Sequence, residues 1–332
     1  MRAIQMDKYR GEATLREVPV PAIRADELLL RVRAAAVNPL DGLILRGEVR
    51  LIQDYPMPQT LGNECSGVVE AVGTAVSRFR PGDAIYCRLP WNRIGAFADY
   101  VAVPAAACAA MPVGCDFPTA AAIPLTGLTA WQGITEELEM TAGETLLITG
   151  GSGSFGEMAV PIAKALGLRV IVSGNSRARE RLLQAGADQY IDYKEQNYWE
   201  VLDPVDGVID TLGAREFAHA LSVVKPGGRL LSLRTGPNSA FARRYPFPTL
   251  KRWLFGLAGL RYDRRARKEG KSYRFMFVRA DGEQLASITR LVEERGVRPQ
   301  VAAPLYTLEQ TPEALARMAQ GHTDGKIVIR VS

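Results

Sequence analysis

A glycine-rich turn between a short apolar run and a helical pattern constrains the fold of this chain more than any other segment. The apolar run is Leu146–Ile148, and the turn that follows carries Gly150, Gly153 and Gly156. This spacing is typical of dinucleotide-binding turns, where the glycines permit a tight turn, backbone approach to a pyrophosphate and close packing of the helix. The helix that follows would direct its unpaired N–H groups at a phosphate. The turn therefore predicts a phosphate-bearing ligand.

Apolar runs and helical patterns alternate regularly around this turn. We expect strands at 145–149, 169–173, 189–191, 207–210 and 229–233, and helices at 154–166, 177–185, 195–202 and 214–224. Such alternation implies right-handed crossovers and a doubly wound parallel sheet, which makes the fold class α/β.

The residues on either side of the alternating part show different secondary-structure patterns. Residues 1–120 read as short strands broken by Pro and Gly, which favours a partly open barrel or sandwich. Towards the other end we expect a strand at about 273–279, a helix at 282–295, a strand at 301–306, a helix at 312–319 and a strand at 326–331. We therefore divide the chain into 1–120, 121–260 and 261–332.

Composition limits the environment of the protein. Its 332 residues are 47% hydrophobic and contain no apolar run long enough for a membrane span. The first residues lack the apolar core of a signal peptide, so a cytoplasmic location is expected. The four cysteines form no Cys-x-x-Cys pair and predict thiols rather than a disulfide framework.

Positive charge is concentrated in one segment. Between Arg243 and Arg274 there are eleven Lys and Arg residues against Asp263 and Glu269, a net charge of +9 in a chain of +5 overall. Such a segment is either a solvated arginine-rich helix or loop, or a surface that attracts phosphates, acyl-CoA or lipid head groups. Interleaved Trp253 and Leu257 suggest that part of it is amphipathic.

Six short motifs occur in an order that resembles the medium-chain dehydrogenase/reductase superfamily, in its zinc-independent quinone oxidoreductase (zeta-crystallin-like) branch. They are Asn38–Asp41, Gly62–Gly67, Arg80–Asp83, Gly127–Ala130, Gly186–Asp188 and Gly325–Val328. The resemblance covers essentially the whole chain. It implies a GroES-like catalytic domain, a Rossmann domain, and a C-terminal segment that returns to the catalytic domain. It also implies a nicotinamide and substrate site between the domains.

The resemblance also bears on metal binding. Zinc-dependent relatives carry Cys where this chain has Asn38, His where it has Asn63, and a second Cys near 123–126. Catalytic zinc needs three ligands drawn from His, Cys and carboxylate, so we expect no metal. Glu64, at a position where relatives keep an acid, is interpreted as a buried carboxylate with satisfied hydrogen bonds rather than as a proton donor.

The segment after the second strand of the alternating part indicates the cofactor. It contains Ser173, Asn175, Ser176 and Arg179, with no acid before Glu180. NAD-binding domains place an acid here on the ribose 2′-hydroxyl, whereas hydroxyl and guanidinium groups suit a 2′-phosphate. The sequence therefore predicts NADPH.

The resemblance implies further cofactor contacts. Tyr193 would flank the 2′-phosphate together with Arg179. The backbone of Gly153, Ser154 and Phe155 would bind the pyrophosphate. The remaining positions are Thr129 near the nicotinamide, Leu212 and Gly213 near the adenosine ribose, Phe275 and Phe277 near the carboxamide, and Lys326 at the ribose or phosphate.

A metal-free hydride transfer needs an acceptor that is already electrophilic, such as a quinone or an α,β-unsaturated carbonyl. The candidate donors to the developing oxyanion are Asn38, Arg46 and Thr126, whereas Asp41 would orient the loop or a water. Two alternatives stay open: an enoyl-thioester reductase that acts on CoA or carrier-protein substrates, and a non-enzymatic NADPH-binding structural or RNA-binding protein. Quinone oxidoreductases commonly pair through an edge strand, which implies a homodimer joined at 273–279.

Overall fold

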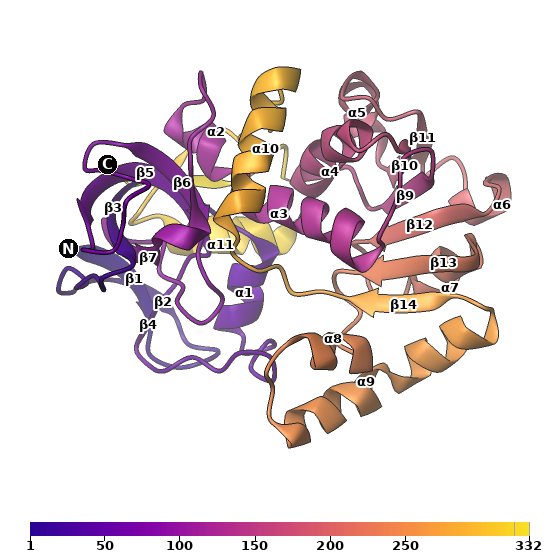
Figure 1. The fold of residues 1–332 in the computed structure, drawn as a ribbon, viewed down its shortest axis with the longest axis horizontal. Coiled ribbons are helices and arrows are strands. Elements are labelled where there is room, and N and C mark those ends of the chain that lie inside the picture. Colours follow the sequence, from indigo (N-terminus) through magenta and orange to yellow (C-terminus); the bar gives the residue numbers. More distant parts are fainter. Residues whose placement is uncertain (322, 332) are drawn as a thin grey trace. The chain divides into compact units, whose positions relative to one another are not determined.

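The computed structural model describes residues 1–321 and 323–331, and the chain forms two compact units (Figure 1). Unit 1 consists of Met1–Leu128 and Arg279–Ser332, and unit 2 is the continuous stretch Thr129–Val278. Unit 1 is thus built from two separate parts of the sequence. The three-part division expected from the sequence stays a prediction.

Unit 2 is built on a six-stranded sheet in which every pair is parallel. Its order is β11-β10-β9-β12-β13-β14, so the sequence runs outward from β9 first to one edge and then to the other. The strands are β9 (Thr145–Thr149), β10 (Arg169–Gly174), β11 (Gln189–Asp192), β12 (Val205–Asp210), β13 (Val224–Ser232) and β14 (Ser272–Phe275). This confirms the predicted doubly wound sheet.

Helices connect these strands and bury apolar residues against them. They are α4 (Ser154–Ala165), α5 (Arg179–Gln184), α6 (Tyr198–Val201), α7 (Phe217–Ser222), α8 (Ser239–Arg244) and α9 (Thr249–Lys268). The strands read as near-continuous apolar runs because both faces of a parallel sheet are covered. In β9, for example, Leu146, Leu147 and Ile148 are all fully buried.

The last strand of this sheet is shorter than predicted. The sequence favours a strand at about 273–279, but β14 ends at Phe275. Phe275 lies opposite Ser232, the last residue of β13, so the residues after it have no neighbouring strand to bond. The prediction is therefore wrong for residues 276–279.

Unit 1 is rich in short strands, as predicted. A three-stranded sheet has the order β2-β1-β4, and a larger one has the order β15-β16-β3-β5-β6-β8, with β7 also paired to β3. The strands are β1 (Arg2–Met6), β2 (Ala13–Glu17), β3 (Glu27–Ala36), β4 (Gln59–Thr60), β5 (Glu64–Val72), β6 (Ala84–Arg88), β7 (Tyr100–Pro104), β8 (Cys108–Ala110), β15 (Tyr306–Thr307) and β16 (Val328–Arg330). The remaining helices are α1 (Pro39–Leu45), α2 (Phe117–Ala121), α3 (Pro124–Gln132), α10 (Gly282–Arg295) and α11 (Thr311–Gln320).

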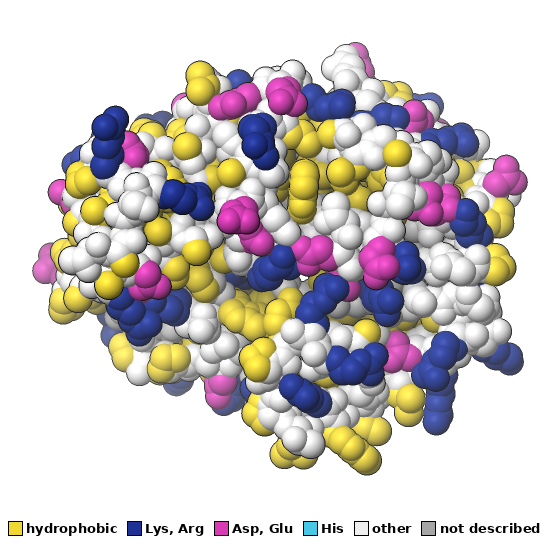
Figure 2. Space-filling view, viewed as in Figure 1, with side chains coloured by type: hydrophobic (Ala, Val, Ile, Leu, Met, Phe, Trp, Pro, Cys, Tyr) yellow, Lys and Arg dark blue, Asp and Glu magenta, His cyan; other side chains and the backbone are white. Residues whose placement is uncertain are grey.

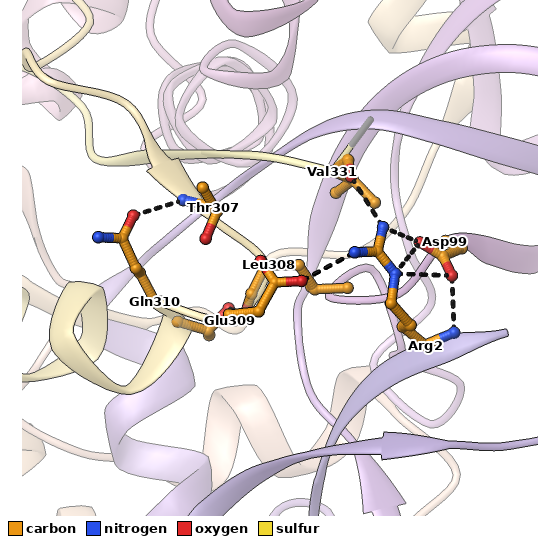
Figure 3. Close-up of polar contacts among 8 residues, drawn as sticks. Arg2, Asp99, Thr307, Leu308, Glu309, Gln310 and Val331 are labelled. Carbon is orange, nitrogen blue, oxygen red and sulfur yellow. Dashed lines mark hydrogen bonds and ion pairs between the residues drawn. The ribbon is translucent and has the colours of Figure 1, made fainter.

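The C-terminal part of unit 1 is joined to the N-terminal part through β16, which pairs antiparallel with β3. Arg2 strengthens this connection (Figure 3): its guanidinium bonds Asp99 at 2.9 Å and Glu309 at 2.8 Å. It also donates to the backbone oxygen of Val331 at 3.3 Å. Segments from both ends of the chain therefore form one structure, as the resemblance implied.

The strand predicted at 301–306 is wrong. Only Val301 makes an isolated bridge, to Lys326, and the short strand β15 begins at Tyr306. Pro304 lies in the middle of the predicted strand, and a proline has no N–H group to donate to a neighbouring strand.

Two further features of the described residues bear on the expectations from composition. None of the helices there is long and apolar enough to cross a lipid bilayer. The four cysteines are free thiols, of which Cys65, Cys87 and Cys108 are buried.

Candidate functional site

The glycine turn after β9 brings backbone segments so close together that side chains would not fit. Gly150 has a φ of +64°, and a Cβ on it would lie 2.6 Å from the side chain of Leu212. A Cβ on Gly156 would overlap the carbonyl of Gly151, with the carbonyl carbon only 2.8 Å away. By contrast, a Cβ on Gly153 would meet nothing within 4 Å. Two of the three predicted glycines are therefore required by packing, and Gly153 leaves open space.

The helix α4 begins directly at this turn. Gly153 is its N-cap and contributes no side-chain bond, so Ser154, Phe155 and Gly156 form an uncapped first turn. The first N–H groups of a helix have no partner within the helix, and they create a positive end that binds anions. The residues predicted to bind the pyrophosphate, Gly153, Ser154 and Phe155, therefore lie at an uncapped helix N-terminus beyond the carboxyl end of β9.

A buried carboxylate orders the loop after β12 at the same edge of the sheet. Asp210 accepts hydrogen bonds from the backbone N–H of Leu212 at 2.8 Å, from that of Gly213 at 3.0 Å and from the Ser232 hydroxyl at 2.8 Å. Burial raises the pKa of Asp210, and the bonds donated to its oxygens act in the opposite direction. Leu212 and Gly213 were predicted to border the cofactor. Asp210, which positions their backbone, was not among the predicted site residues.

The loop after β10 is fixed by contacts that the sequence prediction also missed. The Asn175 amide donates to the Ser152 hydroxyl at 3.1 Å, and the Tyr190 hydroxyl donates to the Asn175 carbonyl at 2.5 Å. A Cβ on Gly174 would lie 2.8 Å from that of Ser152, so the second strand also ends at a required glycine. These bonds hold the loop after β10 against the glycine turn.

The residues predicted to recognise a 2′-phosphate differ in their exposure. Ser173 is buried inside β10, whereas Ser176, Arg177 and Arg179 are exposed. The two arginines have no hydrogen bond or ion pair with the residues that the structure describes. Tyr193 is also exposed. The loop therefore presents hydroxyl and guanidinium groups and no acid before Glu180.

Unit 1 contains a buried polar cluster formed by Asn38, Asp41, Asn63, Glu64 and Lys326. The Lys326 ammonium donates to the Asn38 amide oxygen at 2.6 Å and pairs with Glu64 at 2.9 Å. The Asn38 amide nitrogen donates to Glu64 at 2.8 Å. The second oxygen of Glu64 accepts the backbone N–H of Leu125 at 2.6 Å. Glu64 is thus a satisfied buried carboxylate, as predicted.

Asp41 lies beside this pair and is also fully buried. One of its oxygens accepts the backbone N–H of Asn38, the residue that caps α1, at 2.7 Å. The other accepts the Asn63 amide, also at 2.7 Å. Burial raises the pKa of Asp41 to about 7, with Glu64 adding to this rise and the hydrogen bonds and Lys326 opposing it. Asp41 therefore orients the start of α1.

The raised pKa of Asp41 makes the stability of the protein depend on pH. Folded Asp41 keeps a proton up to about pH 7, but the unfolded group loses it near its ordinary value of 3.8. Its stabilising contribution is therefore complete below pH 4 and is lost as the pH rises through 7. Between pH 5 and 8 we expect the ionisation of Asp41 to lower the free energy of unfolding by about 3 kcal/mol. This fall should be absent in Asp41→Asn.

Denaturant titrations at several pH values measure this dependence. Asp41→Asn should fold, because the Oδ1 atom of Asn63 has no hydrogen-bond partner among the described residues and can accept the new amide after a flip. Asp203→Asn, which removes an exposed carboxylate, is the matched control. Equal pH profiles for Asp41→Asn and the unchanged protein would contradict the assignment.

The other predicted site residues lie as follows. Thr126 is buried and donates its hydroxyl to the Ala122 carbonyl at 3.1 Å, and half-exposed Arg46 pairs with Glu48. The Lys326 side chain is 1% exposed and its ammonium is bonded within the buried cluster, so its contact with a ribose or phosphate stays a prediction. The buried residues Thr129, Phe275 and Phe277 belong to unit 2, where the Phe277 carbonyl accepts the Tyr245 hydroxyl.

The chemistry of the buried cluster does not suit zinc. At the positions of two zinc ligands the chain has Asn38 and Asn63, which lack the thiolate and imidazole donors that structural and catalytic zinc sites use. The Lys326 ammonium occupies the same cluster and already neutralises Glu64. In the described part of the chain, no three His, Cys, Asp or Glu side chains are arranged to hold a metal ion. We therefore assign no step to a metal.

Comparisons with known proteins agree with this architecture. Residues 24–113 match the family described as "Alcohol dehydrogenase GroES-like domain", and residues 185–329 match "Zinc-binding dehydrogenase". All of the chain aligns at 30% identity with 89% of "NAD(P)H oxidoreductase RTN4IP1, mitochondrial" from Bos taurus. The chain belongs to the medium-chain dehydrogenase/reductase superfamily.

Other members of the superfamily place the chain in its quinone oxidoreductase branch. The structure of the quinone oxidoreductase from Coxiella burnetii superposes with a TM-score of 0.83 and 26% identity, covering 100% of this chain and 99% of that one. The "NADPH-dependent alkenal/one oxidoreductase, chloroplastic" of Arabidopsis thaliana is 28% identical over 99% of this chain and 79% of its own. The chain is accordingly an oxidoreductase that uses a nicotinamide cofactor.

Proposed function

We propose that this member of the superfamily is an NADPH-dependent, metal-free reductase that transfers hydride to a quinone or an α,β-unsaturated carbonyl. The observation that carries the proposal is the charge of the loop after β10. Exposed Ser176, Arg177 and Arg179 follow the strand that ends at Gly174, where NAD-binding domains keep an acid. The names of the quinone and alkenal reductases among the relatives support the choice of acceptor.

The residues of unit 2 have separate tasks in this proposal. The first N–H groups of α4 bind the pyrophosphate, and Asp210 holds the backbone of Leu212 and Gly213 at the adjoining loop. Arg179, together with Ser176, binds the 2′-phosphate through charge-assisted hydrogen bonds. The reduced nicotinamide, when bound, supplies the hydride. The carboxamide contact of Phe275 and Phe277 stays a prediction.

Hydride addition to a quinone or enone leaves negative charge on the acceptor oxygen, and a hydrogen-bond donor stabilises it. Of the three proposed donors, the Asn38 amide already donates to Glu64 and to the Ala36 carbonyl, and the Thr126 hydroxyl donates to the Ala122 carbonyl at the end of α2. Arg46 uses its Nε for Glu48, and the other guanidinium nitrogens have no hydrogen bond among the described residues. Arg46 is therefore the donor that we favour.

Reversing one charge tests the cofactor assignment. In Arg179→Glu we expect KM for NADPH to rise on the order of 10- to 100-fold, because one charge-assisted hydrogen bond contributes about 1.5–3 kcal/mol. KM for NADH should change much less, since it lacks the 2′-phosphate. Arg169→Glu is the matched control, because Arg169 is exposed at the opposite end of the same strand, β10. An unchanged NADPH:NADH preference in Arg179→Glu would reject the proposed phosphate site.

Steady-state assays with three acceptors test the reaction. NADPH oxidation is measured with a quinone, a short alkenal and a crotonyl-CoA analogue. Turnover of the quinone or alkenal supports the proposal. Turnover of the thioester alone would favour an enoyl-thioester reductase, and tight NADPH binding without turnover of any acceptor would favour a non-enzymatic protein.

Two further expectations stay predictions. The first is a homodimer joined at β14, the outer strand of the sheet. The Asn238 amide already donates to the Tyr273 carbonyl at 3.1 Å, so fewer backbone groups of β14 are left for a partner strand. Sedimentation analysis decides this, and a monomer at micromolar concentration rejects the dimer. The cytoplasmic location is tested by cell fractionation.

A further inference from the structure

The long helix α9 carries an apolar stripe on its outer side. Leu250, Trp253, Leu254 and Leu257 follow the i, i+3, i+4, i+7 spacing of one helical face, and their exposures are 73%, 67%, 41% and 55%. Single exposed apolar residues are ordinary, but four on adjacent turns of one helix mark an interaction surface. We call this set the α9 stripe.

The α9 stripe is separate from the face by which the helix packs on unit 2. The buried residues of α9 are Phe255, Gly259, Tyr262 and Ala266, which also recur with helical spacing. At 100° per residue their mean direction lies nearly opposite that of the stripe. Gly259 is a required close contact, since a Cβ there would lie 2.6 Å from the Asn238 backbone. The helix is therefore anchored, and the stripe faces away from the unit.

The outer side of α9 changes from apolar to cationic along its length. Arg261, Arg264, Arg265 and Lys268 continue the direction of the stripe through the last turns of the helix. Arg264 and Lys268 have no ion pair with any described residue, whereas Arg265 pairs with Glu269 at 3.6 Å. The one acid within α9, Asp263, accepts the Asn238 amide at 2.8 Å, away from this side. No carboxylate of α9 itself therefore lies on the outer side, and Glu269, which follows the helix, pairs with Arg265 there.

Further positive charge lies on the flank of α9. A pocket of about 360 Å³ is formed between α8, α9 and β14, and its lining includes Arg243, Arg267 and Arg274, with Asp263 as its one acid. Lys271 also lines it, but its ammonium pairs with Glu269 at 2.9 Å. Figure 2 shows hydrophobic side chains at the lower edge of the view, where Figure 1 draws the start of α9, and Lys and Arg side chains farther along. An anionic surface would complement this charge.

We propose that α9 binds the surface of an anionic phospholipid bilayer, with the α9 stripe inserted among the acyl chains and the cations on the phosphate groups. An apolar stripe containing Trp beside Lys and Arg is typical of helices that lie in the membrane interface. A nucleic acid would match the cations but leave the three leucines in water. A second copy of this chain that docked through the same side of α9 would be repelled, because it would bring the same excess of positive charge.

Sedimentation of the full chain with vesicles tests the proposal. We expect the protein to bind vesicles of phosphatidylcholine mixed with phosphatidylserine, to bind pure phosphatidylcholine weakly, and to dissociate at high salt. The double variant Trp253→Ser/Leu257→Ser should lower the partition coefficient on the order of tenfold or more, and Arg264→Gln/Lys268→Gln should have a similar effect. Val201→Ser and Arg169→Gln, which change an exposed apolar and an exposed cationic residue of unit 2, are the matched controls.

Tryptophan fluorescence and oligomeric state give independent readouts. Emission should shift to shorter wavelength with anionic vesicles, and Trp253→Ser alone should abolish the shift. Absence of vesicle binding, equal binding to neutral vesicles, or equal binding by the stripe variants would overturn the proposal. It would also be overturned if the stripe variants dissociated a dimer without vesicles, or if RNA bound in place of vesicles. NADPH binding and turnover are measured separately, so failure here leaves the proposed reductase function standing.

Discussion

Replacing Lys326 with Met is expected to lower the free energy of unfolding by about 3–5 kcal/mol, because it leaves the buried carboxylate of Glu64 without its cation. Glu64 would keep the hydrogen bonds from Asn38 and Leu125, but these groups carry no net charge. The Asn38 amide oxygen would also lose its 2.6 Å donor. Denaturant unfolding near pH 7 measures the loss.

The double variant Lys326→Met/Glu64→Gln is the control for this experiment. Removing the carboxylate as well takes away the uncompensated buried charge, so we expect more than half of the lost stability to return. The experiment also separates two roles for Lys326. If Lys326 instead contacted the ribose or phosphate of NADPH, Lys326→Met would raise KM for NADPH and leave the free energy of unfolding unchanged. That result would contradict the role assigned by the buried cluster.

A second large effect is expected for Gly156→Ala in the glycine turn. The new Cβ would overlap the carbonyl of Gly151, and backbone on both sides must move to make room. Overpacking in a dense interior costs about 1–3 kcal/mol, and an overlap with backbone rather than a flexible side chain lies at or above the upper end of that range. Because α4 would move with Gly156, NADPH binding should be lost as well.

Gly153→Ala is the matched control in the same turn. Its Cβ would meet no atom within 4 Å, and its φ of −97° suits any residue. Stability should therefore stay within about 1 kcal/mol of the unchanged protein. Thermal unfolding and NADPH titration of the two variants give the comparison. Equal stability of Gly156→Ala and Gly153→Ala would show that the close approach at Gly156 does not constrain the turn.

The parts of the structure that the sequence predicted are those determined by local patterns. Glycine spacing predicted the turn after β9, and apolar runs predicted the parallel strands around it. The sequence pointed to the exposed arginines after β10 because no acid precedes Glu180 there, and their contact with a 2′-phosphate stays a prediction. The helix α10 begins and ends at the predicted residues 282–295.

The residues that the prediction missed act through contacts between distant segments. Asp210 was visible only as the end of a strand, and its bonds to Leu212, Gly213 and Ser232 depend on two strands meeting in the sheet. Tyr190 and Gly174 were missed for the same reason. For Lys326, the resemblance implied a cofactor contact, which stays a prediction, and gave no sign of the ion pair in which the ammonium lies 2.9 Å from Glu64. Such a pair has no signature in spacing, because 262 positions separate the two residues.

The return of the chain to unit 1 has a consequence for the order in which the protein is made. Lys326 contacts Asn38 across 288 positions, so the ribosome must synthesise all the residues between them before the buried cluster can form. Unit 2 is continuous from Thr129 to Val278, and all its strands have emerged before β16 is synthesised. Domains generally fold as units during synthesis. The dinucleotide-binding unit can therefore mature first, whereas the residues before Thr129 can complete unit 1 only after β16 has been synthesised.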